Sequence, residues 1–243
     1  AHPLLFADDL KLYSDETTIP CPSSPNSFFS LILQYSLDVI SNWSAMWQLP
    51  ISHSKCSVLC ISSKNLPSRS YYLDSICLPQ VSSCVDLGII VDDKLSFSTH
   101  ISSLNKKAYT RSILISRCFV SKNCSLLAKA FTTYVRPLIE YCPQIWSPHY
   151  LKYINLVENV QRRFTKHIPS IKNLPYPTRL SRLSLISLEL RRRHFDLFPQ
   201  KSTANNREVV NVIKRRPKFC HNNRLPTIVK LIILYRNYHP NYP

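Results

Sequence analysis

The pattern of hydrophobic and polar positions changes character near residue 97. Before it, short apolar runs alternate with polar breaks, which is typical of strands joined by tight turns. The pattern predicts a hairpin about Asp8-Asp9, a strand in "KCSVLCIS", a hairpin about Asp74-Ser75, and another strand in "VDLGIIV". This part of the chain is therefore expected to be built from hairpins.

One long helix is predicted between residues 27 and 49. Apolar residues recur there at the spacing of a helical stripe: Phe28, Leu31, Ile32, Tyr35, Val39, Trp43 and Trp47. Such a stripe is usually buried against the rest of the domain. We expect it to face the core.

Helices are predicted throughout residues 99–197. Two candidates cover 99–119 and 124–141, and Pro137 should kink or end the second. Over 150–168 an apolar stripe runs from Leu151 to Ile168, and four cations lie off it: Lys152, Arg162, Arg163 and Lys166. This is the pattern of an amphipathic helix with a basic face. Another helix is expected near 184–197.

Composition favours a folded domain. The chain has 243 residues, 44% of them hydrophobic, which is enough for a core. The sequence has no apolar run of the roughly 18 residues that a membrane span needs and no signal peptide, so an intracellular protein is expected. Nine cysteines lack zinc-knuckle spacing and are expected to be reduced core thiols. Gly88 is the only glycine, so other residues must form most of the turns that need a positive φ.

The formal charge of +17 is unevenly distributed. Of the 31 basic residues 13 precede residue 160, and of the 14 acidic residues 11 do, so the net charge is +2 before residue 160 and +15 from there on. A strongly basic region suits a polyanion such as nucleic acid.

Although the chain is basic, the segment "PLLFADDLKLYSDE" has two adjacent carboxylates, Asp8 and Asp9, between apolar runs. Neighbouring carboxylates repel each other and are costly where hydration is lost, unless a cation sits between them. They are the hard oxygen ligands that magnesium prefers, and nucleotide polymerases use paired magnesium ions. An ordinary polar turn is the alternative.

Further segments bear on that choice. "LFADDLKLY" resembles the aromatic-Ala-Asp-Asp motif of reverse transcriptases. The later segments resemble, in the same order, the carboxyl-terminal half of non-LTR (LINE-type) retrotransposon reverse transcriptases: "SNWSAMWQLPISHSKCSVL", "DLGIIVDDKLSFSTHI", "YVRPLIEYCPQIWSPHYLKYINLVENVQRRFTKHI" and "YPTRLSRLSLISLELRRRHFDL". The resemblance covers about residues 4 to 198.

The resemblance implies an α+β fold. It consists of an incomplete polymerase palm of antiparallel hairpins backed by a helix (1–97), an all-helical thumb (98–198) and a basic, loosely ordered tail (199–243). It also implies an RNA-directed DNA polymerase that uses Mg²⁺, deoxynucleotides, an RNA template and a DNA primer, and that has no membrane partner.

 

The corresponding expectation for the location is intracellular and nuclear. The oligomeric state is left open by these residues.

The resemblance assigns roles to individual residues. Asp8 takes the place of the metal-binding and catalytic carboxylate, with Asp9 as its supporting neighbour, and Lys55 lies where it would meet the leaving pyrophosphate. Nucleic-acid contacts are implied for Phe6, Leu87, Gly88, Arg136, Trp146, Arg162, Arg163 and Lys166. Structural alternatives stay open for three of them: Lys55 as a solvated lysine, Gly88 as a β-bulge and Trp146 as a core residue.

Two further features depart from an active enzyme of this family. The family's first catalytic aspartate lies upstream of the Asp-Asp motif, and only seven residues precede Asp8, so this chain by itself is not expected to polymerise. Asp74-Ser75 stands where relatives have Asn-Gly or Asp-Gly, which suggests a different turn or a decayed copy. A non-catalytic nucleic-acid-binding module and an inactive relic are therefore the alternative functions. The run Arg191-Arg192-Arg193 is either a solvated face or part of a nuclear-import signal.

Overall fold

The computed structural model describes residues 2–6, 9–15, 25–61, 70–197 and 228–234. The chain divides into two compact units, a first unit of residues 1–96 with 219–243 and a second unit of residues 97–218. The sequence pattern changes at nearly the same place, close to residue 97. Each unit is described by itself below.

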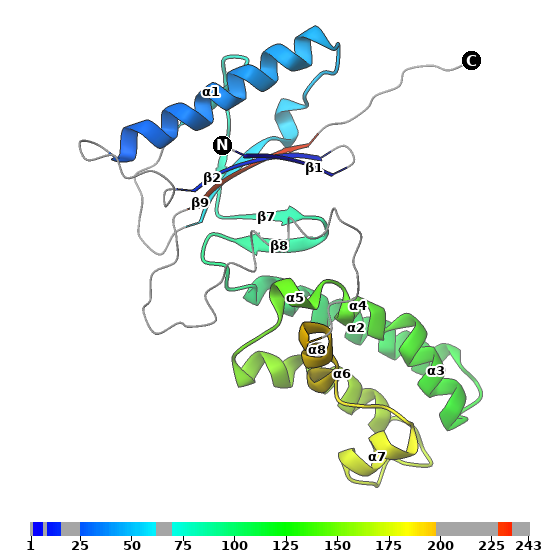
Figure 1. Cartoon of the computed structure of the whole chain (residues 1–243). Helices are drawn as coiled ribbons and strands as arrows, with labels where there is room; N and C mark the ends of the chain where they lie inside the picture. The colour runs from blue at the N-terminus through cyan, green and yellow to red at the C-terminus, as the bar shows by residue number, and fades with distance from the viewer. Residues whose placement is uncertain (1, 7–8, 16–24, 62–69, 198–227, 235–243) are drawn as a thin grey trace, which may run out of the picture. The chain divides into compact units, whose positions relative to one another are not determined.

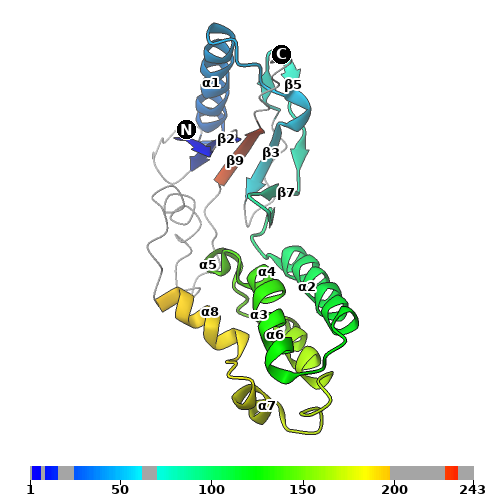
Figure 2. The same cartoon turned by 90° about the vertical axis from the view of Figure 1, so that its right-hand side faces the viewer.

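A five-stranded sheet forms the centre of the first unit. Its strand order is β1 (His2–Phe6), β2 (Asp9–Asp15), β9 (Ile228–Leu234), β3 (Ser57–Ile61) and β6 (Gln80–Val81). Figure 2 shows β9 between β2 and β3. The neighbouring strands are antiparallel except for β3 and β6, which are parallel. The α+β class is confirmed, but the expectation of antiparallel pairing throughout is wrong at this one pair.

Strand β9 corrects the expectation of a loosely ordered tail for residues 228–234, and the rest of 199–243 lies outside the described residues. The sequence of β9, "IVKLIIL", is rich in β-branched and apolar residues, which favour a strand paired on both sides. It pairs with β2 along seven residues and with β3 along five. The prediction failed because the flanking residues are basic and rich in proline, and the short apolar run among them was given too little weight.

Two small hairpins complete the first unit. One joins β4 (Tyr72–Leu73) to β5 (Ile76–Cys77), as predicted. The other joins β7 (Ser83–Asp86) to β8 (Ile89–Asp92), so the single strand predicted in "VDLGIIV" is wrong. Leu87 and Gly88 reverse the chain there with φ of 46° and 81°. A two-residue turn with positive φ at both positions accounts for the glycine, and the β-bulge alternative is therefore wrong.

Helix α1 (Pro25–Met46) lies against this sheet (Figure 1). The face that it buries differs from the one predicted. Leu33 and Leu37 are fully buried, in one cluster with Leu10 and Leu12 of β2. Five members of the predicted core stripe are exposed instead: Leu31, Tyr35, Val39, Trp43 and Trp47, with 70% of Tyr35 accessible to solvent. The helix is apolar on two faces, so spacing alone fitted both, and the sheet covers the aliphatic one.

The second unit is entirely helical in its described part. Its helices are α2 (Ser98–Cys118), α3 (Cys124–Tyr134), α4 (Arg136–Glu140), α5 (Pro143–Trp146), α6 (Leu151–Lys166), α7 (Tyr176–Arg182) and α8 (Leu188–Leu197). The predicted break near Pro137 is confirmed, since this proline lies in the first turn of α4, where a missing N–H costs nothing. The short helices α5 and α7 were not predicted.

The core of the second unit is aromatic and aliphatic. Phe131 of α3 stacks on Phe164 of α6 with ring centroids 4.8 Å apart, and both are buried. Asn123 caps α3 by accepting hydrogen bonds from the backbone N–H of Ser125 and Leu126. The stacked rings join α3 to α6 and bury the side of α6 that carries Phe164.

The structure bears on two expectations from composition, the state of the cysteines and the presence of membrane-spanning helices. All seven cysteines in the described part of the chain are free thiols. Cys56 is buried in the core and Cys60 packs against it, so the expectation of core thiols is confirmed for these two residues and is wrong for the exposed Cys77 and Cys118. Within the described ranges, none of the helices combines the length and the apolar character required to cross a bilayer.

Candidate nucleic-acid interface

The backbone around the Asp-Asp motif is a hairpin, as predicted. Phe6 pairs with Asp9 across β1 and β2, so the two strands are joined by two residues, Ala7 and Asp8. Asp8 itself lies outside the described residues, as do the side chains of Phe6 and Asp9. The register alone puts the motif at the tip of a strand pair.

Lys55 lies at the same edge of the sheet as Asp9. Lys11 of β2 and Ser57 of β3 both pair with Ile232 of β9, so β2 and β3 run in the same direction on either side of that strand. Asp9 begins β2, and Lys55 is exposed in the short 3-10 helix η1 (His53–Lys55) just before β3. Because adjacent strands lie about 4.8 Å apart, Lys11 and Ser57, which flank Ile232, are separated by about 10 Å.

A buried ion pair connects β2 to the β7–β8 hairpin. The ammonium of Lys11 donates to the carboxylate of Asp86, and both side chains are 4% exposed. Asp86 immediately precedes the Leu87–Gly88 turn, so this pair ties the turn to β2, two residues from Asp9. Sequence reasoning missed the pair, although a lysine inside an apolar strand signals a charge that needs a buried partner.

A complete magnesium site is not formed by the described residues. They contain no cluster of three His, Cys, Asp or Glu side chains that could hold a metal ion. Two-metal chemistry needs more carboxylates than Asp8 and Asp9 supply. The metal pair that the resemblance implies stays a prediction, because Asp8 and the side chain of Asp9 lie outside the described residues.

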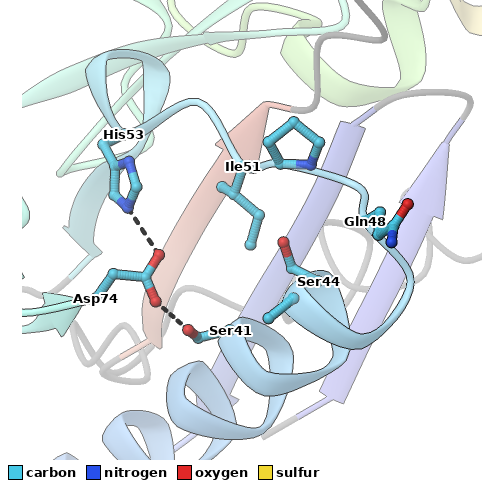
Figure 3. A pocket seen from close by; sticks show the side chains of 8 residues that line it. Ser41, Ser44, Gln48, Ile51, His53 and Asp74 are labelled. Atoms are coloured by element: carbon cyan, nitrogen blue, oxygen red, sulfur yellow. Dashed lines mark hydrogen bonds and ion pairs between the residues drawn. The ribbon is translucent and has the colours of Figure 1, made fainter.

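A pocket of about 460 Å³ lies beside α1 in the same unit, and three polar side chains meet in it (Figure 3). The hydroxyl of Ser41 donates to one carboxylate oxygen of Asp74, and Nε2 of His53 lies 2.9 Å from the other. The hydrogen bond from Ser41 lowers the pKa of Asp74, with a smaller contribution from His53, while partial burial opposes it. In this cluster the Asp74 carboxylate stands between Ser41 and His53. In a nucleophilic triad the histidine stands next to the serine and removes its proton, so this cluster does not activate Ser41.

The same cluster explains the hairpin turn that lacks glycine. Asp74 and Ser75 have φ of 49° and 65°, so the turn has the positive φ at both central positions that is typical of Asn-Gly and Asp-Gly hairpin turns. Non-glycine residues pay a steric cost there. The hydrogen bonds on the Asp74 side chain compensate by holding the turn against α1. The alternative of a different turn is therefore wrong.

The cations of α6 share one exposed face, as predicted. Lys152, Arg162, Arg163 and Lys166 are all exposed, whereas Val157, Val160 and Phe164 on the opposite side are buried. We call these four cations the basic face of α6. Helical periodicity keeps them within about 100° of one another around the helix axis.

Two tyrosines that sequence reasoning missed orient this face. The Arg162 guanidinium lies over the ring of Tyr176, 5.1 Å from its centroid, and the Arg163 guanidinium lies 5.4 Å from the centroid of Tyr109 on α2. A guanidinium over an aromatic face is attracted by the ring quadrupole. Both cations are therefore partly held in place before any ligand binds.

A buried carboxylate fixes one of these tyrosines. Glu158 on the inner side of α6 accepts a hydrogen bond from the hydroxyl of Tyr176 and another from the backbone N–H of Leu188, 2.9 Å away, at the first residue of α8. Burial and the bond to Glu158 raise the pKa of Tyr176 far above its usual range. Acidic groups suit a helix N-terminus, so Glu158 anchors α7 and α8 while the basic face stays open.

Two other predicted nucleic-acid contacts, Trp146 and Arg136, interact with other residues of the second unit instead. Trp146 is 1% exposed, and its indole N–H donates to the carbonyl of Tyr141 at 2.8 Å, so the core alternative describes it and it cannot stack on a base. Arg136 is partly buried beside Glu140, 3.7 Å away. Burial and the nearby Arg191 lower the pKa of Arg136. Neither residue belongs to an exposed basic surface.

The three consecutive arginines of α8 take separate roles. Arg191 pairs with Glu140 through two hydrogen bonds, Arg192 is buried, and Arg193 pairs with Glu189 one turn away on the same helix. A solvated basic face therefore describes Arg193 alone. The alternative of a nuclear-import signal stays a prediction.

Comparison with known proteins gives distant relatives. The chain is 30% identical over 110 residues to an uncharacterized protein of Caenorhabditis elegans, covering 44% of this chain and 56% of that protein. It is 25% identical over 175 residues to the probable RNA-directed DNA polymerase from transposon BS of Drosophila melanogaster, covering 70% of this chain and 19% of that protein. It is 23% identical over 131 residues to the probable polymerase of the same name from transposon X-element, covering 53% and 14%.

These similarities connect the chain to polymerases of mobile elements. Mobile element jockey contributes further relatives with the name RNA-directed DNA polymerase, at 22% and 23% identity. No protein-family profile matches the chain, and no solved structure matches it. The chain spans about half the length of the nematode relative and less than a fifth of each polymerase. It is thus a partial homologue of retrotransposon RNA-directed DNA polymerases.

Proposed function

We propose that the chain is the carboxyl-terminal portion of a non-LTR retrotransposon reverse transcriptase, in which the second unit binds an RNA template paired with a DNA primer. The observation that carries this proposal is the basic face of α6. Residues 97–218 hold 23 basic and 5 acidic residues, a net charge of +18, and four of the exposed cations project from one side of this helix.

The dimensions of the basic face suit a duplex. Lys152 and Lys166 are fourteen residues apart, which is about 21 Å along a helix. A nucleic-acid duplex carries a negative charge about every 1.7 Å of its axis, so a face of this length passes many phosphates. Cations held by aromatic rings lose less conformational freedom on binding than free ones do. The contacts are to phosphates, so we expect little sequence preference.

The binding experiment measures the affinity of the full chain for an RNA–DNA duplex at several salt concentrations. We expect the logarithm of the affinity to fall linearly with the logarithm of salt concentration, because bound cations release counterions. The double variant Arg162→Ala and Arg163→Ala is expected to reduce the magnitude of that slope by about 2.

The matched control removes two exposed lysines outside α6, Lys94→Ala with Lys129→Ala. It is expected to leave the slope nearly unchanged. If the control lowers the slope as much as the α6 variant, the binding is unspecific attraction to a basic protein and the assigned face is wrong. A chain without measurable duplex affinity at physiological salt would favour an inactive relic.

The polymerase part of the proposal concerns the first unit. In a longer polypeptide that supplies the upstream carboxylate, Asp8 and Asp9 would contribute Mg²⁺ ligands, Lys55 would lie near the deoxynucleotide, and Phe6, Leu87 and Gly88 would line the primer. The common edge of β2 and β3 and the Lys11–Asp86 link support this arrangement. The metal would supply charge neutralisation at the transferred phosphate.

The test uses such a longer polypeptide with Asp8→Asn. We expect nucleotide incorporation to fall by at least about 1,000-fold, because an amide is a far weaker ligand for a hard cation than a carboxylate. The control is Asp15→Asn, the same substitution at the far end of β2. Incorporation that survives Asp8→Asn would remove the assignment of Asp8.

A further inference from the structure

Helix α1 carries a second apolar face, on the side that does not meet the sheet. We call it the outer face of α1, and its members are 42–78% exposed: Leu31, Tyr35, Val39, Trp43, Met46 and Trp47. The first four follow one another at intervals of four residues, so they form a continuous ridge along the helix. A ridge of large apolar side chains open to water is costly for an isolated protein.

The composition of α1 excludes two classes of partner. Residues Pro25–Met46 contain no lysine or arginine, and Asp38 is their one charged residue. Nucleic-acid binding depends on cations that neutralise phosphates. Helices that lie on anionic membranes likewise carry lysine and arginine beside their apolar face. The outer face therefore suits an apolar protein surface.

We propose that the outer face of α1 binds the same face of a second copy of this chain, forming a two-fold symmetric dimer. Charge supports a second copy as the occupant. Residues 1–96 and 219–243 hold 8 basic and 9 acidic residues, a net charge of −1, so two first units meet without strong repulsion despite the +17 of the whole chain. This proposal is independent of the function assigned to the second unit.

The area of the outer face also fits a dimer. A large side chain offers about 200 Å², so six that are roughly half exposed present about 600 Å² per copy. Two copies would bury about 1,200 Å², the lower end of the range for specific protein interfaces. A smaller patch would be expected to remain solvated.

The spacing along the ridge is self-complementary. If two copies of α1 cross in antiparallel orientation, with the two-fold axis midway between Tyr35 and Val39 on the outer face, Tyr35 of each copy meets Val39 of the other, and Leu31 meets Trp43. A symmetric interface requires this reciprocity, since the same patch serves both partners. Ridges with four-residue spacing pack into one another in the commonest class of helix crossing.

The experiment is sedimentation equilibrium of the full chain over a range of protein concentrations. It is performed at high salt, because salt dissolves complexes bridged by nucleic acid while apolar interfaces persist. We expect a monomer–dimer equilibrium. Tyr35→Lys is expected to raise the dimer dissociation constant by about 100-fold, since it places a charge at the centre of the interface.

The matched control is Val120→Lys, which adds the same charge at a residue that is 93% exposed in the second unit. It is expected to leave the dissociation constant unchanged. Circular dichroism checks that both variants keep their helices. A chain that is monomeric at every concentration, or a dimer that Tyr35→Lys does not weaken, would overturn the proposal.

A second variant tests the antiparallel arrangement. Tyr35→Lys combined with Val39→Glu in one chain places opposite charges against each other twice across the two-fold axis. We expect the combined variant to dimerise at least about 10-fold more tightly than Tyr35→Lys alone. A combined variant that binds no better than the single one would rule out this pairing of the two residues.

Discussion

At the scale of single residues, function and stability depend on partners that are distant in sequence. Lys11 and Asp86 are separated by 75 positions and form one buried ion pair. The pair links the strand that begins at Asp9 to the turn at Leu87 and Gly88. A buried charge that loses its partner is much more costly than an exposed one, so this pair should be sensitive to single substitutions.

We predict that Lys11→Met lowers the free energy of unfolding of the first unit by about 3–5 kcal/mol, because it leaves the Asp86 carboxylate buried without its cation. Combining it with Asp86→Leu should recover most of the loss, since two apolar side chains can fill the same space. Urea unfolding measures both variants.

The control for this pair is Lys94→Met, which removes a lysine that is exposed in the same unit. Its expected effect is within about 0.5 kcal/mol, as for most surface substitutions. Should Lys11→Met cost no more than this control, the ion pair does not hold the hairpin on the sheet.

The two hairpin turns show what a single residue can and cannot determine. Gly88 indicated a special backbone position, and its φ of 81° confirms that a glycine is used there. Ser75 has φ of 65° without being glycine, because Asp74 beside it is held by Ser41 and His53. A turn can thus keep its geometry through tertiary hydrogen bonds when its local sequence is unfavourable.

At the scale of elements, the same periodicity rule succeeded for α6 and failed for α1. In α6 the side opposite the apolar stripe carries charges, so the buried side is unambiguous. In α1 both sides are apolar and Asp38 is the one charged residue, so the spacing of Tyr35 and Val39 fitted the core as well as that of Leu33 and Leu37. Contacts with the sheet decide between two apolar faces.

Strand β9 gives the prediction that belongs to this scale. Deletion of residues 219–243 removes the strand that lies between β2 and β3. We expect amide hydrogen exchange in both of these strands to become much faster, because each loses its hydrogen-bonded neighbour. Duplex binding by the second unit should persist, since the basic face of α6 lies outside the deleted segment.

The control deletion removes residues 235–243 and leaves β9 in place. It should preserve the slow exchange of β2 and β3. If the longer deletion leaves that exchange slow as well, β9 is not an integral strand of the sheet.

At the scale of the whole molecule, charge is separated between the two units. The first unit has a net charge of −1 and the second +18, a sharper separation than the division at residue 160 gives. A basic second unit attracts polyanions, while a nearly neutral first unit can associate through apolar surface. The two proposals of duplex binding and dimerisation therefore rest on different units of one chain.

The sequence by itself determined the α+β class, most helices and hairpins, and the basic face of α6, because these follow from local periodicity and turn chemistry. Tertiary structure alone decided the buried face of α1, the place of β9 in the sheet, the Lys11–Asp86 pair and the burial of Trp146. Each of these depends on which of two apolar faces packs better or on partners far apart in the chain. A local sequence pattern does not contain the free energy of such contacts.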